Sequence, residues 1–189
     1  MTVTAPTTET GIPGYEAATW TIDPVHSEVG FSVRHMMVSK VRGRFTKFSG
    51  QLVTGEDLTK SSATAEIDLS SINTGQDQRD DHIRSADFFE VETYPTMTYK
   101  STGVRVEDGE YILDGDLTLK GVTKSVPLRL ELNGFGPDAY GGTRAGFTAT
   151  GEINRHDFNV NFNAPLQNGG VVVSEKIALH LEIEAVKEA

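Results

Sequence analysis

The sequence contains no cysteine among its 189 residues, which excludes disulfide bonds, thiolate catalysis and cysteine-based zinc sites. Basic residues are also scarce, because 17 Lys and Arg stand against 27 Asp and Glu and give a formal net charge of −10. An acidic protein repels polyanions, so a general nucleic-acid-binding surface is not expected. A local basic patch remains compatible with this overall charge.

Long apolar runs are missing as well. No stretch is long enough to cross a bilayer as a helix, and the first residues, MTVTAPTTETGIPGYEAA, show neither the basic nor the apolar segment of a secretion signal. The sequence therefore predicts a cytoplasmic protein without stable membrane insertion. Residues 1–18, rich in Thr, Pro and Gly, are expected to form a flexible N-terminal arm, and residues 19–189 a single folded domain.

What the sequence does have, from Trp20 onward, is an apolar residue at every second position. Near the C-terminus Ile177, Leu179 and Leu181 alternate with polar residues, which is typical of a strand with one buried and one wet face. The same alternation recurs in about eight segments. These are residues 23–37, 41–54, 63–69, 96–106, 111–120, 128–133, 145–153 and 177–185.

Short connections join these segments. Asp108 and Gly109 stand between two of them as a hairpin signal, since both residues tolerate positive φ. Sequential strands with short turns favour an up-and-down antiparallel sheet that closes into a barrel and so loses its edges. The exception is the segment 73–89, where helical spacing replaces alternation and Thr74 and Asp77 resemble a capping box. The prediction is an all-β, extended eight-stranded antiparallel barrel with a helical insertion between strands 3 and 4.

The helical insertion is expected to pack across the barrel. Phe88 and Phe89 would be its apolar anchors, and Arg79, Asp80 and Arg84 would hold it by polar contacts. This expectation follows from the abrupt change of period, and the family resemblance described below also implies a helix against the barrel.

The histidines give no pattern for catalysis or metal binding. None of the five has another histidine at helical or short strand spacing, and acids adjacent in sequence to His82 and His156 point in other directions. We therefore expect no catalytic residue, metal or cofactor. By parity His26 falls on the outer face, bonded to Asp23 or Ser27, whereas His35 falls on the inner face at the end of its strand.

Four segments of the chain resemble the YceI-like family, the lipocalin-like polyisoprenoid-binding proteins. In order they are TIDPVHSEVGFSVRHMMVSKVRGRF, RDDHIRSADFFEVETYPTMTY, GDLTLKGVTKSV and GFTATGEINRHDFNV. The resemblance covers residues 20–186 and implies a barrel with a helix against it, enclosing an apolar tunnel for a long isoprenoid or fatty-acyl chain. Many members carry a signal peptide for the periplasm, and no such signal is recognisable here.

The inward positions also indicate a hollow interior. An eight-stranded barrel is either filled by its side chains or just wide enough for a small ligand. Here large inward residues such as Phe31 and Phe147 are mixed with small ones such as Ala65 and Ala149, which leaves room. A solid barrel, in which each alanine faces a large neighbour, stays open as the alternative.

Charge is unevenly distributed. Residues 30–55 contain no Asp or Glu, yet Arg34, Lys40, Arg42, Arg44 and Lys47 fall within them. We interpret this stretch as a positive rim that recognises an anionic head group, with Arg42 the leading candidate, or else as a solvated strand face. The expected ligand-binding residues are Phe31, Val33, His35, Arg42, Phe45, Ala65, Ile67, Met97, Tyr99, Leu117, Leu119, Phe147, Ala149, Leu179 and Leu181.

The sequence thus predicts non-catalytic binding, sequestration or transport of a long-chain amphiphilic lipid, of polyisoprenoid or fatty-acyl type, in the barrel interior. Two other classes of function stay open: an enzyme acting on an isoprenoid lipid, and a scaffold domain with a filled barrel. The expected partner is an isoprenoid or other long-chain lipid and not nucleic acid. A homodimer also stays open.

Overall fold

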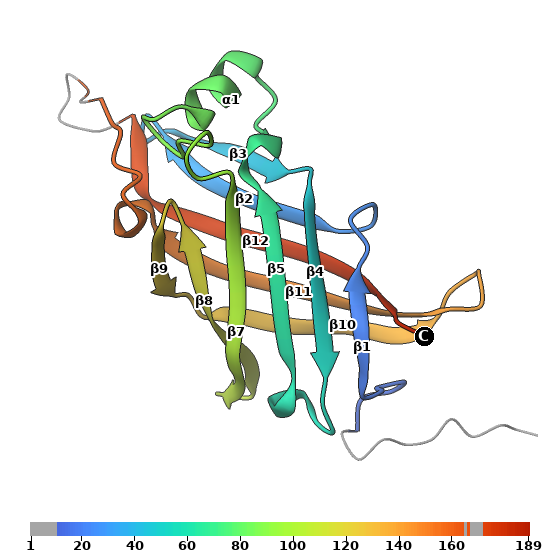
Figure 1. Ribbon diagram of the computed structural model, residues 1–189. Helices are drawn as coiled ribbons and strands as arrows, with labels where there is room; N and C mark the ends of the chain where they lie inside the picture. The colour runs from blue at the N-terminus through green and yellow to red at the C-terminus, as the bar shows by residue number, and fades with distance from the viewer. Residues whose placement is uncertain (1–10, 165, 167–171) are drawn as a thin grey trace, which may run out of the picture.

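The structure is a computed structural model that describes residues 11–164, 166 and 172–189 (Figure 1). It is built almost entirely of strands, as the alternation predicts, with one α-helix and short 3₁₀ turns in the described part. The strands are β1 Ala18–Ile22, β2 Glu28–His35, β3 Ser39–Phe45, β4 Phe48–Thr54, β5 Ser62–Asp68, β6 Ile72–Asn73, β7 Thr96–Glu107, β8 Glu110–Leu119, β9 Val122–Ser125, β10 Leu128–Pro137, β11 Thr143–Asn154 and β12 Val173–Lys187. The helix is α1 Asp77–Arg84, and the 3₁₀ turns are η1 Leu58–Lys60, η2 Leu69–Ser71 and η3 Arg155–Phe158.

Eight of these strands close into an antiparallel barrel. Their order around the ring is β1-β4-β5-β7-β8-β10-β11-β12, and β12 pairs back to β1 through Trp20 opposite Lys187 and Ile22 opposite Ala185. Every strand of this ring therefore pairs with a neighbour on each side, although β8 and β10 share only the pairs from Leu128 opposite Leu113 to Leu130 opposite Tyr111. The predicted all-β class and the eight-stranded antiparallel barrel are confirmed.

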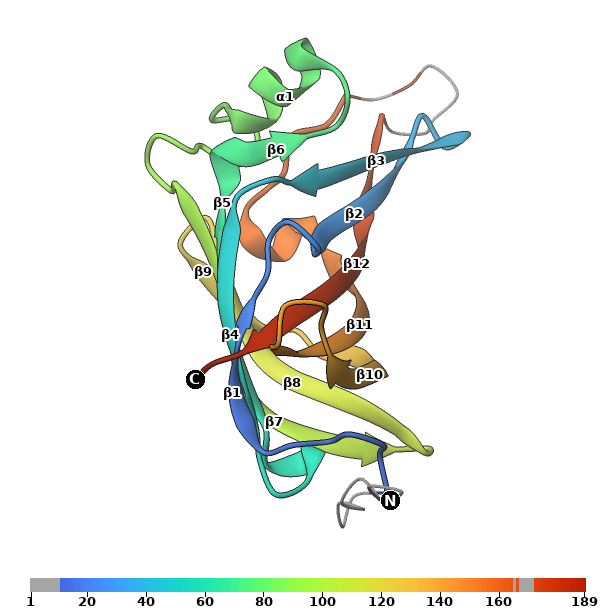
Figure 2. The same cartoon turned by 90° about the vertical axis from the view of Figure 1, so that its right-hand side faces the viewer.

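The strands β2 and β3 extend the wall above β1 and β4 (Figure 2). β1 and β2 follow one another along the same edge of β12, where residues 20–22 pair with 185–187 and residues 28–33 pair with 177–182. β3 pairs with β2, and its last two residues, Arg44 and Phe45, pair with β6. The barrel wall is therefore taller on the β2–β3 side, beside α1.

The predicted position of the helix between strands 3 and 4 is wrong, because α1 follows β6. The chain forms more strands before the helix than the alternation indicates. Residues 41–54, expected as one strand, divide into β3 and β4 at a bend where Thr46 N donates to Ser71 O, and β6 has only two residues. Two-residue strands and bends leave no periodic signal.

The predicted capping box is also absent. The N-cap of α1 is Gln76, whose side chain makes no capping hydrogen bond. Thr74 instead donates through its backbone N–H and its hydroxyl to Oδ1 of Asp80, which is buried. The buried carboxylate of Asp80 therefore holds Thr74, which lies shortly before the helix, by two hydrogen bonds.

The packing of the insertion agrees with expectation. Phe88 and Phe89 pack against the main apolar core. Arg84 donates from Nε to Ser70 O at 2.8 Å and from Nη2 to Ile72 O at 3.1 Å, so it joins the helix to η2 and to β6. The predicted anchoring by Phe88, Phe89 and Arg84 is confirmed, whereas the side chains of Arg79 and Asp80 bond to Thr74, within the insertion itself.

The packed chain begins earlier than the predicted arm boundary at residue 18. Tyr15 is buried, its hydroxyl donates to Gly55 O at 2.9 Å, and its ring meets Phe135 edge-on with centroids 5.2 Å apart. Trp20 is fully buried and donates from Nε1 to Thr54 Oγ1 at 2.9 Å. Residues 1–10 of the predicted arm lie outside the described residues.

The hairpin between β7 and β8 has the predicted turn. Asp108 and Gly109 both take positive φ, 52° and 79°, as a two-residue turn requires. Among the described residues, no helix has the length and apolar character needed to span a membrane.

Candidate functional site

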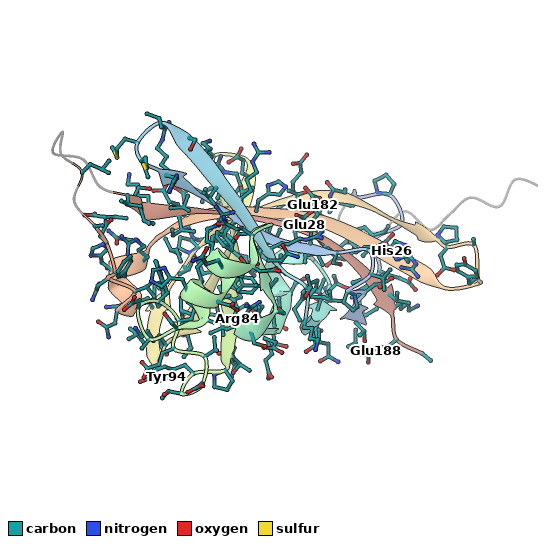
Figure 3. All side chains as sticks on the ribbon, turned by 90° about the horizontal axis from the view of Figure 1, so that it is seen from above. His26, Glu28, Arg84, Tyr94, Glu182 and Glu188 are labelled. Atoms are coloured by element: carbon teal, nitrogen blue, oxygen red, sulfur yellow. The ribbon has the colours of Figure 1, made fainter. Side chains whose placement is uncertain are left out.

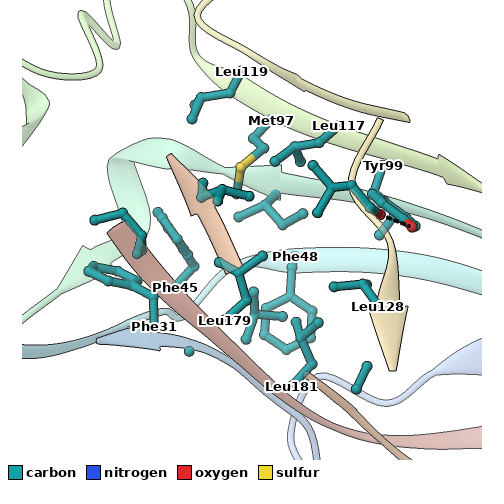
Figure 4. A pocket seen from close by; sticks show the side chains of 18 of the residues that line it. Phe31, Phe45, Phe48, Met97, Tyr99, Leu117, Leu119, Leu128, Leu179 and Leu181 are labelled. Atoms are coloured by element: carbon teal, nitrogen blue, oxygen red, sulfur yellow. Dashed lines mark hydrogen bonds between the residues drawn. The ribbon is translucent and has the colours of Figure 1, made fainter. Parts of the chain in front are cut away.

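A cavity of about 600 Å³ runs inside the barrel (Figure 4). Its wall is made of the inward side chains of the strands, which recur at every second residue because successive residues of a strand face opposite sides. The volume falls within the range of natural small-molecule sites, about 300 to 1,000 Å³. The barrel is therefore hollow, and the alternative of a filled interior does not hold.

Nearly all the predicted ligand-binding residues meet at this cavity, although their contact with a ligand stays a prediction. Those that line it are Phe31, Val33, His35, Phe45, Ala65, Ile67, Met97, Tyr99, Leu117, Leu119, Phe147, Ala149, Leu179 and Leu181. They come from β2, β3, β5, β7, β8, β11 and β12, so residues far apart in the sequence share one interior (Figure 4).

Arg42 is the exception, because it does not line the cavity, and its contact with a head group stays a prediction. It lies opposite Ser32 on the β2–β3 ribbon and is exposed. Val41 and Phe45, of the other parity, line the cavity. A charged side chain directed into this apolar interior would be costly to bury, so alternation places Arg42 on the outer face.

Two aromatic rings lie flat against the wall, and this keeps the centre open. A Cβ at Gly43 would come within 2.4 Å of Cζ of Phe31, and a Cβ at Gly115 would come within 2.4 Å of Cζ of Tyr99. Each ring therefore occupies the space over a glycine on the neighbouring strand. Because the rings cover the wall and do not cross the barrel, they contribute apolar surface without filling the interior.

The one hydroxyl in the middle of the wall is turned away from the cavity. Tyr99 donates to Val126 O at 2.8 Å, and burial raises its pKa above the usual value. The phenol is therefore neutral and its hydrogen-bonding group is used. The centre of the cavity is left with aliphatic and aromatic carbon.

Polar residues gather at the two ends of the cavity. Arg34, His35, Thr74, Arg79 and His82 line the end beneath α1, while the opposite end is lined by Thr54, Ser61 and Ser62. At the α1 end Arg79 donates from Nε to Thr74 Oγ1 and from Nη2 to Thr74 O, both at 2.7 Å. The cavity thus has an apolar middle, a cationic end and a hydroxyl-lined end.

Arg155 is a functional candidate that our sequence reasoning missed. It lines the cavity, is only 3% exposed, and donates to the carbonyl oxygens of Val160, Phe162, Val173 and Ser174 at 2.7, 2.9, 3.1 and 2.9 Å. Desolvation lowers its pKa from the usual value. The shared parity of Arg155 with the inward Ile153 was the one signal for its position.

His26 lies on the outer face, as its parity predicts. His26 Nδ1 lies 2.8 Å from Asp23 Oδ2 on the outer face, and Figure 3 shows it well away from α1 and Arg84. Asp23, His26 and Glu184 have ligand atoms within 4.8 Å of one another. However, Arg144 Nη1 lies 2.8 Å from Asp23 Oδ2 and 3.3 Å from Glu184 Oε2, so a guanidinium already supplies the cation there.

His82, which lines the cavity, does not pair with the acids that precede it in sequence. His82 Nε2 lies 2.8 Å from Asp87 Oδ2, and its ring meets Phe88 and Phe162 edge-on. Asp80 accepts from Thr74, and Asp81 pairs with Arg84. The dyad of His82 with Asp80 or Asp81 that an enzyme would need is therefore not formed.

Comparison of the sequence with known proteins finds relatives that are named UPF0312 proteins. A UPF0312 protein of Staphylococcus epidermidis is 40% identical over 165 residues, which cover 86% of this chain and 94% of the relative. A UPF0312 protein of Photorhabdus laumondii is 40% identical over 164 residues, covering 86% of this chain and 82% of the relative.

Solved structures share the fold. The YCEI protein of Campylobacter jejuni is 29% identical with a TM-score of 0.69, covering 88% of this chain and 96% of that one. BcnA of Burkholderia cenocepacia superposes with a TM-score of 0.75 at 24% identity, covering 86% and 98%. A polyisoprenoid binding domain from Saccharophagus degradans superposes with a TM-score of 0.64 at 19% identity, covering 92% and 100%.

The family model of the YceI-like domain matches residues 20–185, nearly the whole described barrel. The matched range contains every strand of the ring, from Trp20 in β1 to Ala185 in β12, and therefore the entire cavity wall. This chain belongs to the YceI-like family.

Proposed function

We propose that the barrel binds a long-chain amphiphilic lipid, of polyisoprenoid or fatty-acyl type, without covalent chemistry. The observation that carries the proposal is the distribution of polarity along the cavity. Aliphatic and aromatic side chains surround its middle, where the Tyr99 hydroxyl is bonded to Val126 O, and charged side chains line its α1 end. This arrangement suits a ligand with a long hydrocarbon chain and a polar head.

The binding energy would come from the chain. Each methylene transferred from water to an apolar interior gains about 0.8 kcal/mol. The cavity is already open, since Phe31 and Tyr99 lie against the wall over Gly43 and Gly115. A ligand therefore enters without a repacking of the core, and the gain is not offset by reorganisation of the protein.

The polar head would lie at the α1 end. His35, Arg79 and His82 stand there, whereas the opposite end offers hydroxyl groups. A cationic end favours an anionic head such as a phosphate or carboxylate. A polyisoprenoid is also the ligand class named for the Saccharophagus degradans domain that has the same fold.

Other features of the sequence-based account stay predictions. These are a cytoplasmic location, the absence of enzymatic activity, and the existence of a homodimer. Asp80 and Asp81, the acids considered as partners of His82 in an enzyme, bond instead to Thr74 and Arg84.

Native mass spectrometry of the purified protein, followed by organic extraction, tests the proposal. Binding predicts a complex heavier than the polypeptide by the mass of one lipid, and the same lipid recovered unchanged in the extract. Delipidated protein incubated with a polyprenol should recover a complex of that kind. If a modified lipid is released, the protein is an enzyme; if no lipid is retained in either experiment, the cavity is not a lipid site.

A further inference from the structure

The turn between β2 and β3 exposes three consecutive large apolar side chains. Met36, Met37 and Val38 are 44%, 52% and 84% exposed. The other large exposed apolar residues of the described chain, such as Val106 and Tyr140, are isolated in the sequence. Scattered exposed apolar residues are ordinary, whereas a contiguous group indicates a surface that contacts an apolar partner.

The backbone conformation of this turn is one that other residue types adopt at lower cost. Met36 and Met37 take positive φ, 52° and 63°, in a loop closed by the hydrogen bond from Val38 N to His35 O at 3.2 Å. Asn and Gly adopt this conformation readily, and a methionine does so at a steric cost. The apolar side chains are therefore present although the turn itself disfavours them.

The strands that lead to the turn carry a basic outer face. Arg34 lies directly opposite Lys40, and Arg42 and Arg44 continue the same face opposite Ser32 and Gly30. Like charges opposite each other on paired strands are destabilising. In a chain with a net charge of −10, this face is a local reversal of sign.

These cations form no ion pair with an acid among the described residues. The ion pairs formed among the described residues involve other basic side chains, for example those of Arg84, Arg105 and Arg144, and none involves Arg34, Lys40, Arg42 or Arg44. Glu28 and Glu182 lie near Arg44 at the base of the hairpin, but no acid forms an ion pair with the four cations among the described residues, so the basic face can contact an anionic partner.

The apolar turn and the basic face stand at the cavity's α1 end. Arg34 and His35, the residues just before the turn, line that end of the cavity. Figure 2 shows the β2–β3 hairpin projecting beside α1 at the end of the barrel. A ligand entering or leaving there would pass next to the hairpin.

We propose that the β2–β3 hairpin docks the protein on the surface of an anionic lipid bilayer, with Met36, Met37 and Val38 entering the interface and the basic face contacting head groups. Apolar side chains beside Lys and Arg are the composition that binds such interfaces. A second copy of the chain is disfavoured as the partner, because two basic faces would repel each other. Docking goes beyond the proposed function and does not require the cavity to hold lipid.

Sedimentation with vesicles tests this proposal. Delipidated full-length protein should bind vesicles of equal parts phosphatidylglycerol and phosphatidylcholine, bind phosphatidylcholine alone much more weakly, and dissociate at high salt. The double variant Lys40→Gln/Arg42→Gln should bind the anionic vesicles about 25-fold more weakly, since each cation near the surface contributes about a five-fold factor. Lys100→Gln/Lys124→Gln makes the same change of charge on β7 and β9 and should bind as the wild type does.

A second variant tests the contribution of the apolar turn to vesicle binding. Met36→Asn/Met37→Gly supplies residues that favour positive φ, so its melting temperature should be equal or higher while vesicle binding falls at least about ten-fold. Val106→Ser, an exposed apolar residue at the other end of the barrel, should leave binding unchanged. The proposal is overturned if the wild type does not bind anionic vesicles, if either hairpin variant binds as well as its control, or if gel filtration shows that the hairpin variants instead dissociate a dimer.

Discussion

Tyr99 lies over Gly115, and the two residues together set the width of the cavity at its middle. A Cβ on Gly115 would come within 2.4 Å of Cζ of Tyr99, and the phenol hydroxyl is fixed by its hydrogen bond to Val126 O at 2.8 Å. The φ of Gly115 is not in the left-handed region. The glycine is therefore needed for the space above it and not for its backbone conformation.

Replacing this glycine should displace the ring. We expect Gly115→Ala to lower the free energy of unfolding by about 2 kcal/mol, because the added methyl group overlaps a ring that cannot move without losing its hydrogen bond. In a Tyr99→Leu background the same change should cost much less. A double-mutant cycle by urea unfolding measures this coupling, and additive effects would show that the ring does not rest on Gly115.

The ion pair between Asp23 and Arg144 predicts a pH dependence of stability. The Arg144 guanidinium, 2.8 Å from Asp23 Oδ2, and then His26 hold the pKa of Asp23 well below its usual value. A carboxyl group whose pKa is lower in the folded than in the unfolded state stabilises the fold above the unfolded pKa, about 4, and loses that contribution as the pH falls further.

Asp23→Asn should therefore be about 2 kcal/mol less stable than the wild type at neutral pH, and the difference should shrink steadily as the pH falls below about 4. Urea unfolding across this pH range gives the difference. Asp116→Asn, at an exposed carboxylate on β8, serves as the control and should differ little from the wild type. A gap between Asp23→Asn and wild type that stays constant down to the lowest pH would contradict the assignment.

The role of Arg155 in stability should depend on the shape of its side chain as well as on its charge. Its planar guanidinium donates to four backbone carbonyl groups between Val160 and Ser174, which a lysine ammonium cannot reproduce. We expect Arg155→Lys to lower the free energy of unfolding by about 3 kcal/mol, because buried carbonyl oxygens lose their donors. Arg129→Lys, at an exposed ion pair with Glu110, should change it by less than about 0.5 kcal/mol. Equal effects in thermal unfolding would contradict this role for Arg155.

The alternation of apolar residues carried most of what could be predicted about the fold and the cavity. It depends only on neighbours in sequence, so it placed Phe31, Phe147 and Leu179 on the inner face. It did not reveal the two-residue β6 or the bend at Thr46, where alternation is interrupted. It therefore put the helix between strands 3 and 4 instead of after β6.

Sequence patterns could not predict contacts between residues that are far apart in the chain. Arg144 and Asp23 are 121 positions apart, and the carbonyl groups around Arg155 carry no side-chain signature. The burial of Tyr15 depends on Phe135 and Gly55, on other elements of the chain. The basic stretch and the outward parity of Arg42 were recognised in the sequence, but only the register of β2 and β3 shows that Arg34 lies opposite Lys40.

The central claim is that the barrel interior receives the hydrocarbon chain of a lipid, and filling that interior tests it most directly. Ala149 is buried and lines the cavity, whereas Thr150, the next residue of β11, belongs to the other parity and is absent from the lining. Ala149→Phe and Thr150→Phe add comparable bulk, one inside the barrel and one outside.

The measurement is titration of delipidated wild type and both variants with a polyprenol, followed by native mass spectrometry, alongside thermal unfolding. The account predicts that Ala149→Phe binds at least about ten-fold more weakly with little change in melting temperature, because an open cavity accommodates the ring. Thr150→Phe should bind as the wild type does. Equal polyprenol binding by the two variants, or no binding by the wild type, would contradict the claim.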